Sequence, residues 1–248
     1  LSGIAPNPKI ESVREGVKLC KENDIDMVLA IGGGSVIDCA KVVAAGACYD
    51  GDPWDLVITP RWIKKALPIY SVLTLSATGS EMDPFAVISD MSKNEKWGTA
   101  SEHMKPKMSI LDPEYTYSVS KKQTAAGTAD MISHICENYF TNVKNADVQA
   151  RFAEGLLKNC FKYGPIALEE PDNYDARANL MWTASMAING ILSDGAEVSW
   201  CVHPMEHELS AFYDITHGEG LAILTPHWMD FALNDDTASK FADYARNV

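Results

Sequence analysis

The fold is decided by the stretch Asp26-Met-Val-Leu-Ala-Ile-Gly-Gly-Gly-Ser35. Its apolar part is short and unbroken, which is typical of a strand buried in a parallel sheet. Three glycines then interrupt the run, and from Val36 the apolar positions return at helical spacing through Ala40 and Val43. The sequence therefore predicts a strand, a glycine turn and a helix, in that order.

The flanking residues continue this alternation of helices and strands. Upstream, residues 10–21 carry Val13, Val17 and Cys20 on one helical face. Further strands are predicted downstream at Ile69–Leu75, Phe85–Ser89 and Met108–Leu111. This order indicates an α/β domain with a parallel sheet, which we place at residues 1–117.

The second half of the chain has a different pattern. After Asp112-Pro113 the strand signals fade, and helical periodicity takes over at Ile132, Ile135 and Tyr139. Two more helical patterns follow: Val148, Phe152 and Leu156, then Leu180, Ala184, Ala187 and Ile191. We therefore expect residues 118–248 to form an all-helical domain.

Two polar turns follow predicted strands. The glycine turn Gly32–Ser35 lets the backbone approach a ligand, and the helix that follows favours a phosphate at its N-terminus. It matches neither G-x-G-x-x-G nor a Walker A loop, and it could equally be a tight connection. The segment Thr74–Glu81 offers hydroxyls around a second glycine. Both turns should lie at one sheet edge, where open α/β sheets bind ligands.

Bulk properties exclude several classes of protein. The 248 residues hold 34 acidic and 21 basic side chains, and the net charge of −13 opposes binding to nucleic acid or an anionic membrane. Six dispersed cysteines and the lack of an export or membrane-spanning segment favour a cytoplasmic protein. The chain opens at Leu1 without an initiator Met, and its ends, Leu-Ser-Gly and Ala-Arg-Asn-Val, are not typical of natural termini, so we expect it to be truncated at both ends.

Histidines and a carboxylate gather in the helical half. Asp130 and His134 stand four residues apart, so both side chains lie on one face of a helix. His203, His207 and His217 follow within one short stretch, and imidazoles with a carboxylate suit Fe(II) or Zn(II). Spacing alone would also nominate His203 and His207 as the ligand pair. Each histidine, taken singly, is explained as well by packing or exposure.

Taken together, the motifs of this chain resemble the iron-containing alcohol dehydrogenase family. The resemblance runs in order over essentially the whole chain, through Gly32-Gly-Gly-Ser-Val-Ile-Asp-Cys-Ala-Lys41, Ala77-Thr-Gly-Ser-Glu81, Leu111-Asp-Pro113, Asp130-x-x-x-His134-x-x-Glu137, His203-x-x-x-His207 and Thr216-His-Gly218. It is closest to the butanol dehydrogenase-like, NADP(H)-linked aldehyde reductase branch, through Asn179-Leu-Met-Trp-Thr183 and Asn189-Gly190. It implies a dinucleotide-binding α/β domain followed by an all-helical domain, as in the dehydroquinate synthase-like architecture.

The resemblance also implies which residues form the site. Fe(II) or Zn(II) would be held by Asp130, His134, His203 and His217, and His207 would be a site histidine that is not a ligand. The implied cofactor contacts are Gly33, Gly34, Ser35, Asp38, Thr74, Leu75, Thr78, Ser80, Lys96 and Tyr115. NADP(H) is expected in preference to NAD(H), and a homodimer is expected.

Two departures from the family bear on these expectations. Family members begin with a further βα unit on the adenosine side of the cofactor, and their helical domain continues beyond the position of Val248. In addition, Asp83 stands where the closest branch tends to have an amide near the cofactor. A carboxylate there would disfavour a nearby phosphate.

The implied activity is hydride transfer between NAD(P)(H) and a primary alcohol or aldehyde such as butanol or butanal, with the metal polarising the substrate oxygen. His207 is the candidate for relaying the proton, and a positioning role is its alternative. Glu137 and Glu206 either orient ligand imidazoles or, as we expect, face solvent. Four aromatic residues either line the cleft or pack in the core: Trp182, Trp200, Phe212 and Tyr213.

Three other functions fit part of the pattern. A polyol (glycerol-type) dehydrogenase or a dehydroquinate synthase-like enzyme places a metal against a dinucleotide on the same scaffold, but the pair Asp130 and His134 favours the alcohol dehydrogenase. A metal-dependent hydrolase would need no dinucleotide turn, so binding of NAD(P)H would discriminate. A non-catalytic fragment is the third, and the presence of all four ligands argues against it.

Overall fold

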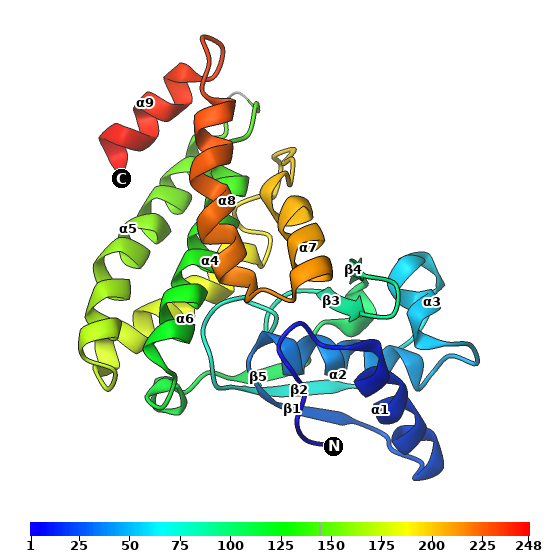
Figure 1. Ribbon diagram of the computed structural model, residues 1–248. Coiled ribbons are helices and arrows are strands. Elements are labelled where there is room, and N and C mark those ends of the chain that lie inside the picture. Colours follow the sequence, from blue (N-terminus) through cyan, green and yellow to red (C-terminus); the bar gives the residue numbers. More distant parts are fainter. Residues whose placement is uncertain (144) are drawn as a thin grey trace.

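The computed structural model describes residues 1–143 and 145–248, and it has an α/β half and a helical half that lie against each other (Figure 1). The α/β half contains α1 (Ile10–Glu22), β1 (Val28–Gly32), α2 (Gly34–Gly46), α3 (Pro53–Ile58), η1 (Pro60–Trp62), β2 (Ile69–Leu73), β3 (Phe85–Asp90), β4 (Glu95–Ala100), η2 (Glu102–Met104), β5 (Met108–Ile110) and η3 (Pro113–Thr116). The helical half contains α4 (Lys121–Tyr139), α5 (Asp147–Glu169), α6 (Tyr174–Ile188), α7 (Val202–Tyr213), α8 (His217–Ala232) and α9 (Ala238–Asn247). The predicted fold class is confirmed, while the exact division at residues 117 and 118 stays a prediction.

A three-stranded parallel sheet carries the first half. Its strand order is β1-β2-β5, and Gly32 at the end of β1 is paired with Leu73 at the end of β2. Helix α2 packs on one face, where Ala30, Ile37 and Leu73 belong to one buried cluster. Because the two strands end side by side, the turns that follow them meet at the same edge of the sheet, as predicted.

The first strand is less buried than its sequence indicates. Alternate residues of β1, Leu29 and Ile31, are 52% and 61% exposed, while Ala30 between them is buried. The prediction of a strand covered on both faces is therefore wrong for the described residues. Side chains alternate between the two faces of a strand, and the face of β1 that carries Leu29 and Ile31 is exposed, while α2 lies on the other face (Figure 1).

One predicted strand lies outside the parallel sheet. β3 pairs with β4 in an antiparallel hairpin, with Phe85 opposite Ala100 and Asp90 opposite Glu95. A four-residue connection ending at Asn94, whose φ is +52°, is short enough only for an antiparallel partner. β4 was not predicted, because its sequence Glu-Lys-Trp-Gly-Thr-Ala lacks an apolar alternation. The hairpin contacts α2 on one side and α7 on the other, so it links the two halves.

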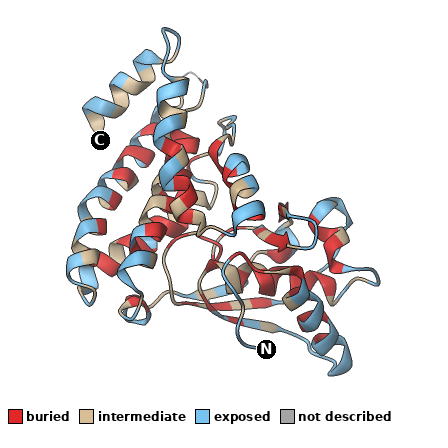
Figure 2. Ribbon diagram, in the orientation of Figure 1, coloured by how far each residue is buried: buried red, intermediate tan, exposed pale blue. Residues whose placement is uncertain are grey.

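Helix α4 is the centre of the second half. It packs against α5, α6 and α8, and it buries apolar residues such as Met131 and Ile135 together with the polar residues Asp130, His134 and Glu137 (Figure 2). A helix surrounded in this way holds its polar side chains in fixed positions. Among the residues that the structure describes, none of the helices has the length and apolarity needed to cross a bilayer.

The two halves meet through backbone contacts at glycines. A Cβ atom on Gly79, whose φ is +68°, would lie 2.7 Å from the carbonyl oxygen of Ala184 in α6. A Cβ atom on Gly127 in α4 would lie 2.5 Å from the carbonyl oxygen of Ser76. The buried carboxylate of Glu81 accepts a hydrogen bond from the Ser185 hydroxyl of α6. The segment after β2 is therefore packed directly onto the helical half.

Candidate functional site

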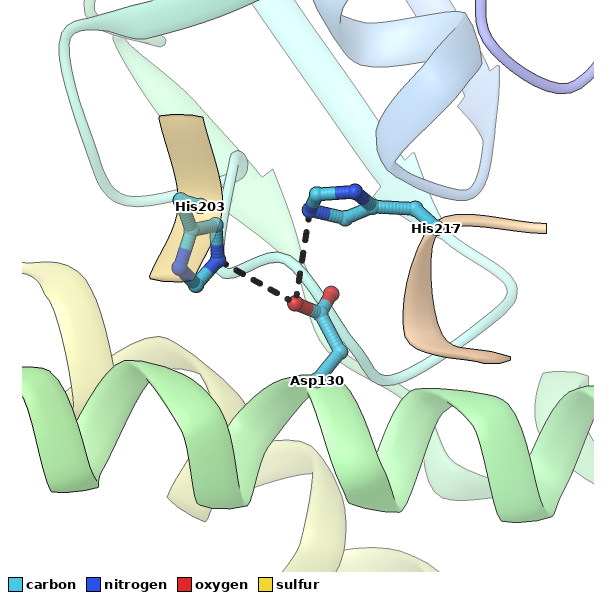
Figure 3. Close-up of side chains that lie close together, drawn as sticks. All are labelled: Asp130, His203 and His217. Carbon is cyan, nitrogen blue, oxygen red and sulfur yellow. Dashed lines mark ion pairs between the residues drawn. The ribbon is translucent and has the colours of Figure 1, made fainter. Parts of the chain in front are cut away.

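Three helices bring a carboxylate and two imidazoles together (Figure 3). Asp130 comes from α4, His203 from the first turn of α7, and His217 begins α8. Asp130 Oδ1 lies 3.7 Å from His203 Nε2 and 3.8 Å from His217 Nε2. Two ligands of one ion at about 2.1 Å in tetrahedral geometry are roughly 3.4 Å apart. The observed spacing is thus a few tenths of an ångström wider than that of a metal site.

The atoms that face one another lack partners within the described residues. Asp130 Oδ1 and His203 Nε2 are buried and accept or donate no hydrogen bond. An unpaired buried polar atom costs about 1–3 kcal/mol, and a charged one costs more. Burial raises the pKa of Asp130, but the facing imidazoles outweigh it and lower the pKa below its usual range. An ionised carboxylate and imidazole nitrogens that converge on one point fit a divalent cation, which would replace any proton on those nitrogens.

His134 lies at the margin of this group. Its Nε2 is 3.6 Å from the same Asp130 Oδ1, and its ring stacks on that of His203 with 4.6 Å between centroids. Its nitrogens are not among the ligand atoms that all lie within 4.8 Å of one another, which are those of Asp130, His203 and His217. Burial lowers the pKa of His134 to about 4, so the ring is neutral and able to ligate. His134 as fourth ligand stays a prediction.

Two glutamates orient the imidazoles, which corrects the expectation that they face solvent. Glu137 and Glu206 are only 3% and 0% exposed. Glu137 binds His203 Nδ1 and also accepts from the backbone N–H groups of Cys201, Val202 and His203, so it caps α7. Glu206 binds His217 Nδ1. A carboxylate on Nδ1 fixes the tautomer that leaves Nε2 free for a metal.

A second group of metal-ligand types does not form a separate metal site. Glu206, His207 and His217 also offer atoms within 4.8 Å of one another. The ammonium of Lys96 lies 3.1 Å from Glu206 Oε2 and 3.3 Å from His217 Nδ1, so a cation already occupies this position. Lys96, predicted as a cofactor contact, thus has a partner within the protein.

His207 stands beside the cluster and reaches the cavity. Its ring centroid is 5.7 Å from that of His217. Burial, with the nearby Lys96 and His217, lowers the pKa of His207 to about 2. The imidazole is therefore neutral at neutral pH. In a proton relay, His207 would therefore first accept a proton and then release it.

A cavity of about 450 Å³ lies between the two halves. From the helical half it is lined by His134, His203, His207 and His217, with Ile188, Trp200 and Pro204, and from the α/β half by Ser35, Asp38, Thr78, Ser80 and Lys96, among others. Of the predicted cofactor contacts, five therefore line the cavity, whereas Gly33, Gly34, Thr74, Leu75 and Tyr115 are not among its lining residues. Tyr115, half exposed in η3, stays a prediction.

The two polar turns contact each other at the mouth of the sheet. The N–H of Thr74 donates to the carbonyl of Gly32 at 3.0 Å. A Cβ atom on Gly34 would lie 2.3 Å from Thr78 Oγ1, and one on Gly33 would lie 3.2 Å from Leu75 Cβ. A side chain at Gly34 would therefore clash with the neighbouring turn, and Gly33 packs closely against it. Because α2 begins at Gly34, the free N–H groups of its first turn remain suited to a phosphate.

Asp38 links two segments of the cavity wall through hydrogen bonds. Its Oδ1 accepts from the Ser80 hydroxyl at 2.6 Å, and its Oδ2 accepts from the Val87 N–H at 2.9 Å. One turn later in α2, the buried Lys41 pairs with Asp83 at 2.8 Å. Asp83, which also lines the cavity, is therefore balanced by an internal cation.

Of the four aromatic residues, only Trp200 lines the cavity. Its ring centroid is 5.0 Å from that of His203 and 5.9 Å from that of His134. Trp182, Phe212 and Tyr213 are exposed, so the expectation that they line the cleft or pack in the core is wrong for the described residues. Nothing in the local spacing distinguishes Trp200 from them except its position three residues before His203.

The fold and the candidate site together combine an α/β half that has nucleotide-type turns with a helical half that carries a cluster of potential metal ligands. Two family models match the chain: "Iron-containing alcohol dehydrogenase" over residues 1–113, and "Fe-containing alcohol dehydrogenase family, C-terminal" over residues 124–248. The chain belongs to the iron-containing alcohol dehydrogenase family.

Several relatives are similar over the whole chain. NADH-dependent butanol dehydrogenase A of Clostridium acetobutylicum is 62% identical over 248 residues, which are 100% of this chain and 64% of the relative. NADPH-dependent aldehyde reductase YqhD of Escherichia coli is 42% identical, over 99% of this chain and 64% of the relative. The solved structure of NADH-dependent butanol dehydrogenase A from Thermotoga maritima matches with a TM-score of 0.91 and 46% identity, over 93% of this chain and 58% of that one. The chain thus spans less than two thirds of these relatives.

Proposed function

We propose that the chain carries the reaction centre of a metal-dependent alcohol dehydrogenase or aldehyde reductase that transfers a hydride between NAD(P)(H) and a primary alcohol or aldehyde such as butanal. The observation that carries the proposal is the unpaired Asp130 Oδ1, which faces imidazole nitrogens beside a cavity shared with the polar turns. The names of the butanol dehydrogenases and the aldehyde reductase support the same substrate class.

We assign the site residues separate roles in metal binding, substrate binding and proton transfer. Asp130, His203 and His217, with His134, would hold a divalent ion, which supplies Lewis acidity toward the substrate oxygen while a nicotinamide supplies or accepts the hydride. Glu137 and Glu206 keep the ligand imidazoles oriented. Trp200 and Ile188 give the cavity an apolar wall that suits an alkyl chain. The neutral ring of His207, which lines the cavity, would pass a proton between the substrate oxygen and solvent.

Iron is the metal we propose, because the family is named for it, and Zn(II) is the alternative. The predicted preference for NADP(H) is not supported by the identities: relatives at 62% and 61% are named NADH-dependent, and the NADPH-dependent reductase is 42% identical. We therefore propose NADH as the preferred cofactor. A homodimer remains part of the proposal, to be tested by light scattering.

The test is metal content and NADH-dependent reduction of butanal, measured on wild type and on His217→Ala after loading with Fe(II) or Zn(II). We expect near-stoichiometric metal and activity in wild type, and loss of both in the variant while circular dichroism is unchanged. Metal-loaded wild type that binds neither NADH nor NADPH would refute the dehydrogenase and leave a metal-dependent hydrolase or a non-catalytic fragment.

A further inference from the structure

Lys96 is a buried cation with three polar neighbours. Its side chain is only 3% exposed, and its Nζ lies 3.1 Å from Asn7 Oδ1, 3.1 Å from Glu206 Oε2 and 3.3 Å from His217 Nδ1. It extends from β4 of the α/β half, whereas Glu206 and His217 belong to the helical half. Lys96 is therefore the point at which the α/β half reaches a ligand of the metal centre.

The directions of these hydrogen bonds are fixed by chemistry. An ammonium has only donors and a carboxylate only acceptors, so Lys96 donates to Glu206 and to Asn7 Oδ1. His217 Nδ1 is also in contact with the Glu206 carboxylate, and this contact requires that Nδ1 carry the proton. The lone pair of His217 is then on Nε2, the atom that faces Asp130. Lys96 and His217 are thus held by the same oxygen of Glu206.

Asn7 keeps the ammonium in place from the other side. Its Nδ2 donates to Asp214 Oδ1 and to the carbonyl of Ile215, both at 3.1 Å, which leaves Oδ1 directed at Lys96. Asn7 is buried, with φ at +50°, a conformation that asparagine tolerates better than most residues. The side chain of Lys96 therefore has one available position.

The buried negative charges around Asp130, His203 and His217 outnumber the buried positive charges. Three carboxylates, Asp130, Glu137 and Glu206, are buried there, and Lys96 is the one ammonium among their described partners. With neutral imidazoles, two negative charges remain, and a divalent cation cancels them. Among the described residues, Glu137 contacts no ammonium group, and it is satisfied by the His203 ring and by backbone N–H groups. A trivalent ion would leave one positive charge uncompensated in a buried site, which is costly.

We infer that Lys96 is a positioning residue of the metal centre, which through Glu206 holds His217 in its ligating tautomer and sets the buried charge so that the site selects a divalent over a trivalent cation. The inference rests on the proposed function, in that it takes the cluster of Asp130, His203 and His217 to be the metal site. It assigns Lys96 a task at the metal in addition to its place on the cavity wall.

The test compares the affinities for Zn(II) and for Ga(III), a trivalent ion without redox chemistry, by chelator competition. In Lys96→Met the ratio of Ga(III) to Zn(II) affinity should rise by roughly ten- to hundredfold, the effect of one unit charge roughly 6–10 Å away in an effective dielectric of about 20. Glu206→Gln removes a negative charge, so the ratio should fall. Lys96→Arg keeps the charge and should stay within about threefold of wild type.

Lys9→Met is the matched control. Lys9 lies in the same region and pairs with Asp214, which is 50% exposed, so solvent screens its charge and the ratio should change little. If Lys96→Met and Glu206→Gln lower both affinities in parallel, or leave the ratio where Lys9→Met leaves it, the inference is overturned while the metal site stands. If wild type binds no Zn(II), the proposed function fails first.

Discussion

A methyl group at Gly218 should separate α8 from α4 and disrupt the proposed metal centre. A Cβ atom there would lie 2.0 Å from the carbonyl oxygen of Ala126 and 2.5 Å from its carbonyl carbon. Because contacts between carbon and oxygen in proteins are about 3.3 Å or longer, the backbone of α8 has to move by more than about 1 Å. His217 is the preceding residue, and its Nε2, now 3.8 Å from Asp130 Oδ1, would move with it.

Metal sites tolerate only about 0.2 Å in ligand distance, so Gly218→Ala should lose at least about tenfold in Zn(II) affinity. Overpacking should also lower the free energy of unfolding by about 1–3 kcal/mol. Chelator competition measures the first quantity and urea unfolding of the metal-free protein the second. The matched control is Gly155→Ala in α5, where no atom lies within 4 Å of the added Cβ.

Gly155→Ala should keep the metal affinity and raise the free energy of unfolding by about 0.5–1 kcal/mol, because alanine has the higher helix propensity. Gly218→Ala with wild-type affinity for Zn(II) would refute the reasoning. It would mean that the contact between α4 and α8 does not determine where His217 stands.

Three further changes test other parts of the site. Glu137→Gln turns an acceptor of the His203 ring and of three backbone N–H groups into a partial donor, so Zn(II) affinity should fall by about 10–100-fold; unchanged affinity in chelator competition would contradict this. Asp38→Asn replaces one of the two acceptor oxygens by an amide NH₂ group and should weaken NADH binding by about tenfold in a fluorescence titration. Unchanged NADH affinity, with or without a loss of stability in urea unfolding, would contradict this. Burial raises the pKa of Glu81 above its ordinary 4.5, so stability is lost as pH rises from below 4.5 through the folded pKa. Glu81→Gln should therefore gain stability relative to wild type as the pH rises from 4 to 8 in urea unfolding, and a pH-independent difference would rule this out.

The sequence predicts correctly those features that depend on local patterning within one helix, or within one strand and the turn after it. The unbroken apolar run before the glycines predicts β1 and the start of α2, since both depend on local patterning. The spacing of Asp130 and His134 places them on one face of a helix, because helical geometry alone brings such residues together. The structure finds both on α4, with the carboxylate as the shared corner of the cluster.

Features that depend on packing between distant elements were missed. Glu137 and Glu206 each follow a site histidine by three residues, at His134 and His203, which is a visible signal. Each carboxylate nevertheless serves a histidine other than that neighbour: Glu137 binds His203, and Glu206 binds His217. Helical spacing cannot reveal this crossed arrangement, because it arises only when α4, α7 and α8 pack together. The antiparallel pairing of β3, with its weakly patterned partner β4, was missed for the same reason.

The glycine contacts between the halves bear on how such proteins can be recombined. The segment from Ser76 to Glu81 follows a strand of the sheet, yet Gly79 rests on the backbone of α6 and Ser76 on Gly127 of α4. A chimera that joins this helical half to a foreign α/β half near residue 118 would pair these glycine-sized gaps with an unrelated loop. The exchangeable unit is therefore discontinuous along the chain, and a functional graft has to transplant residues 76–81 together with the helices.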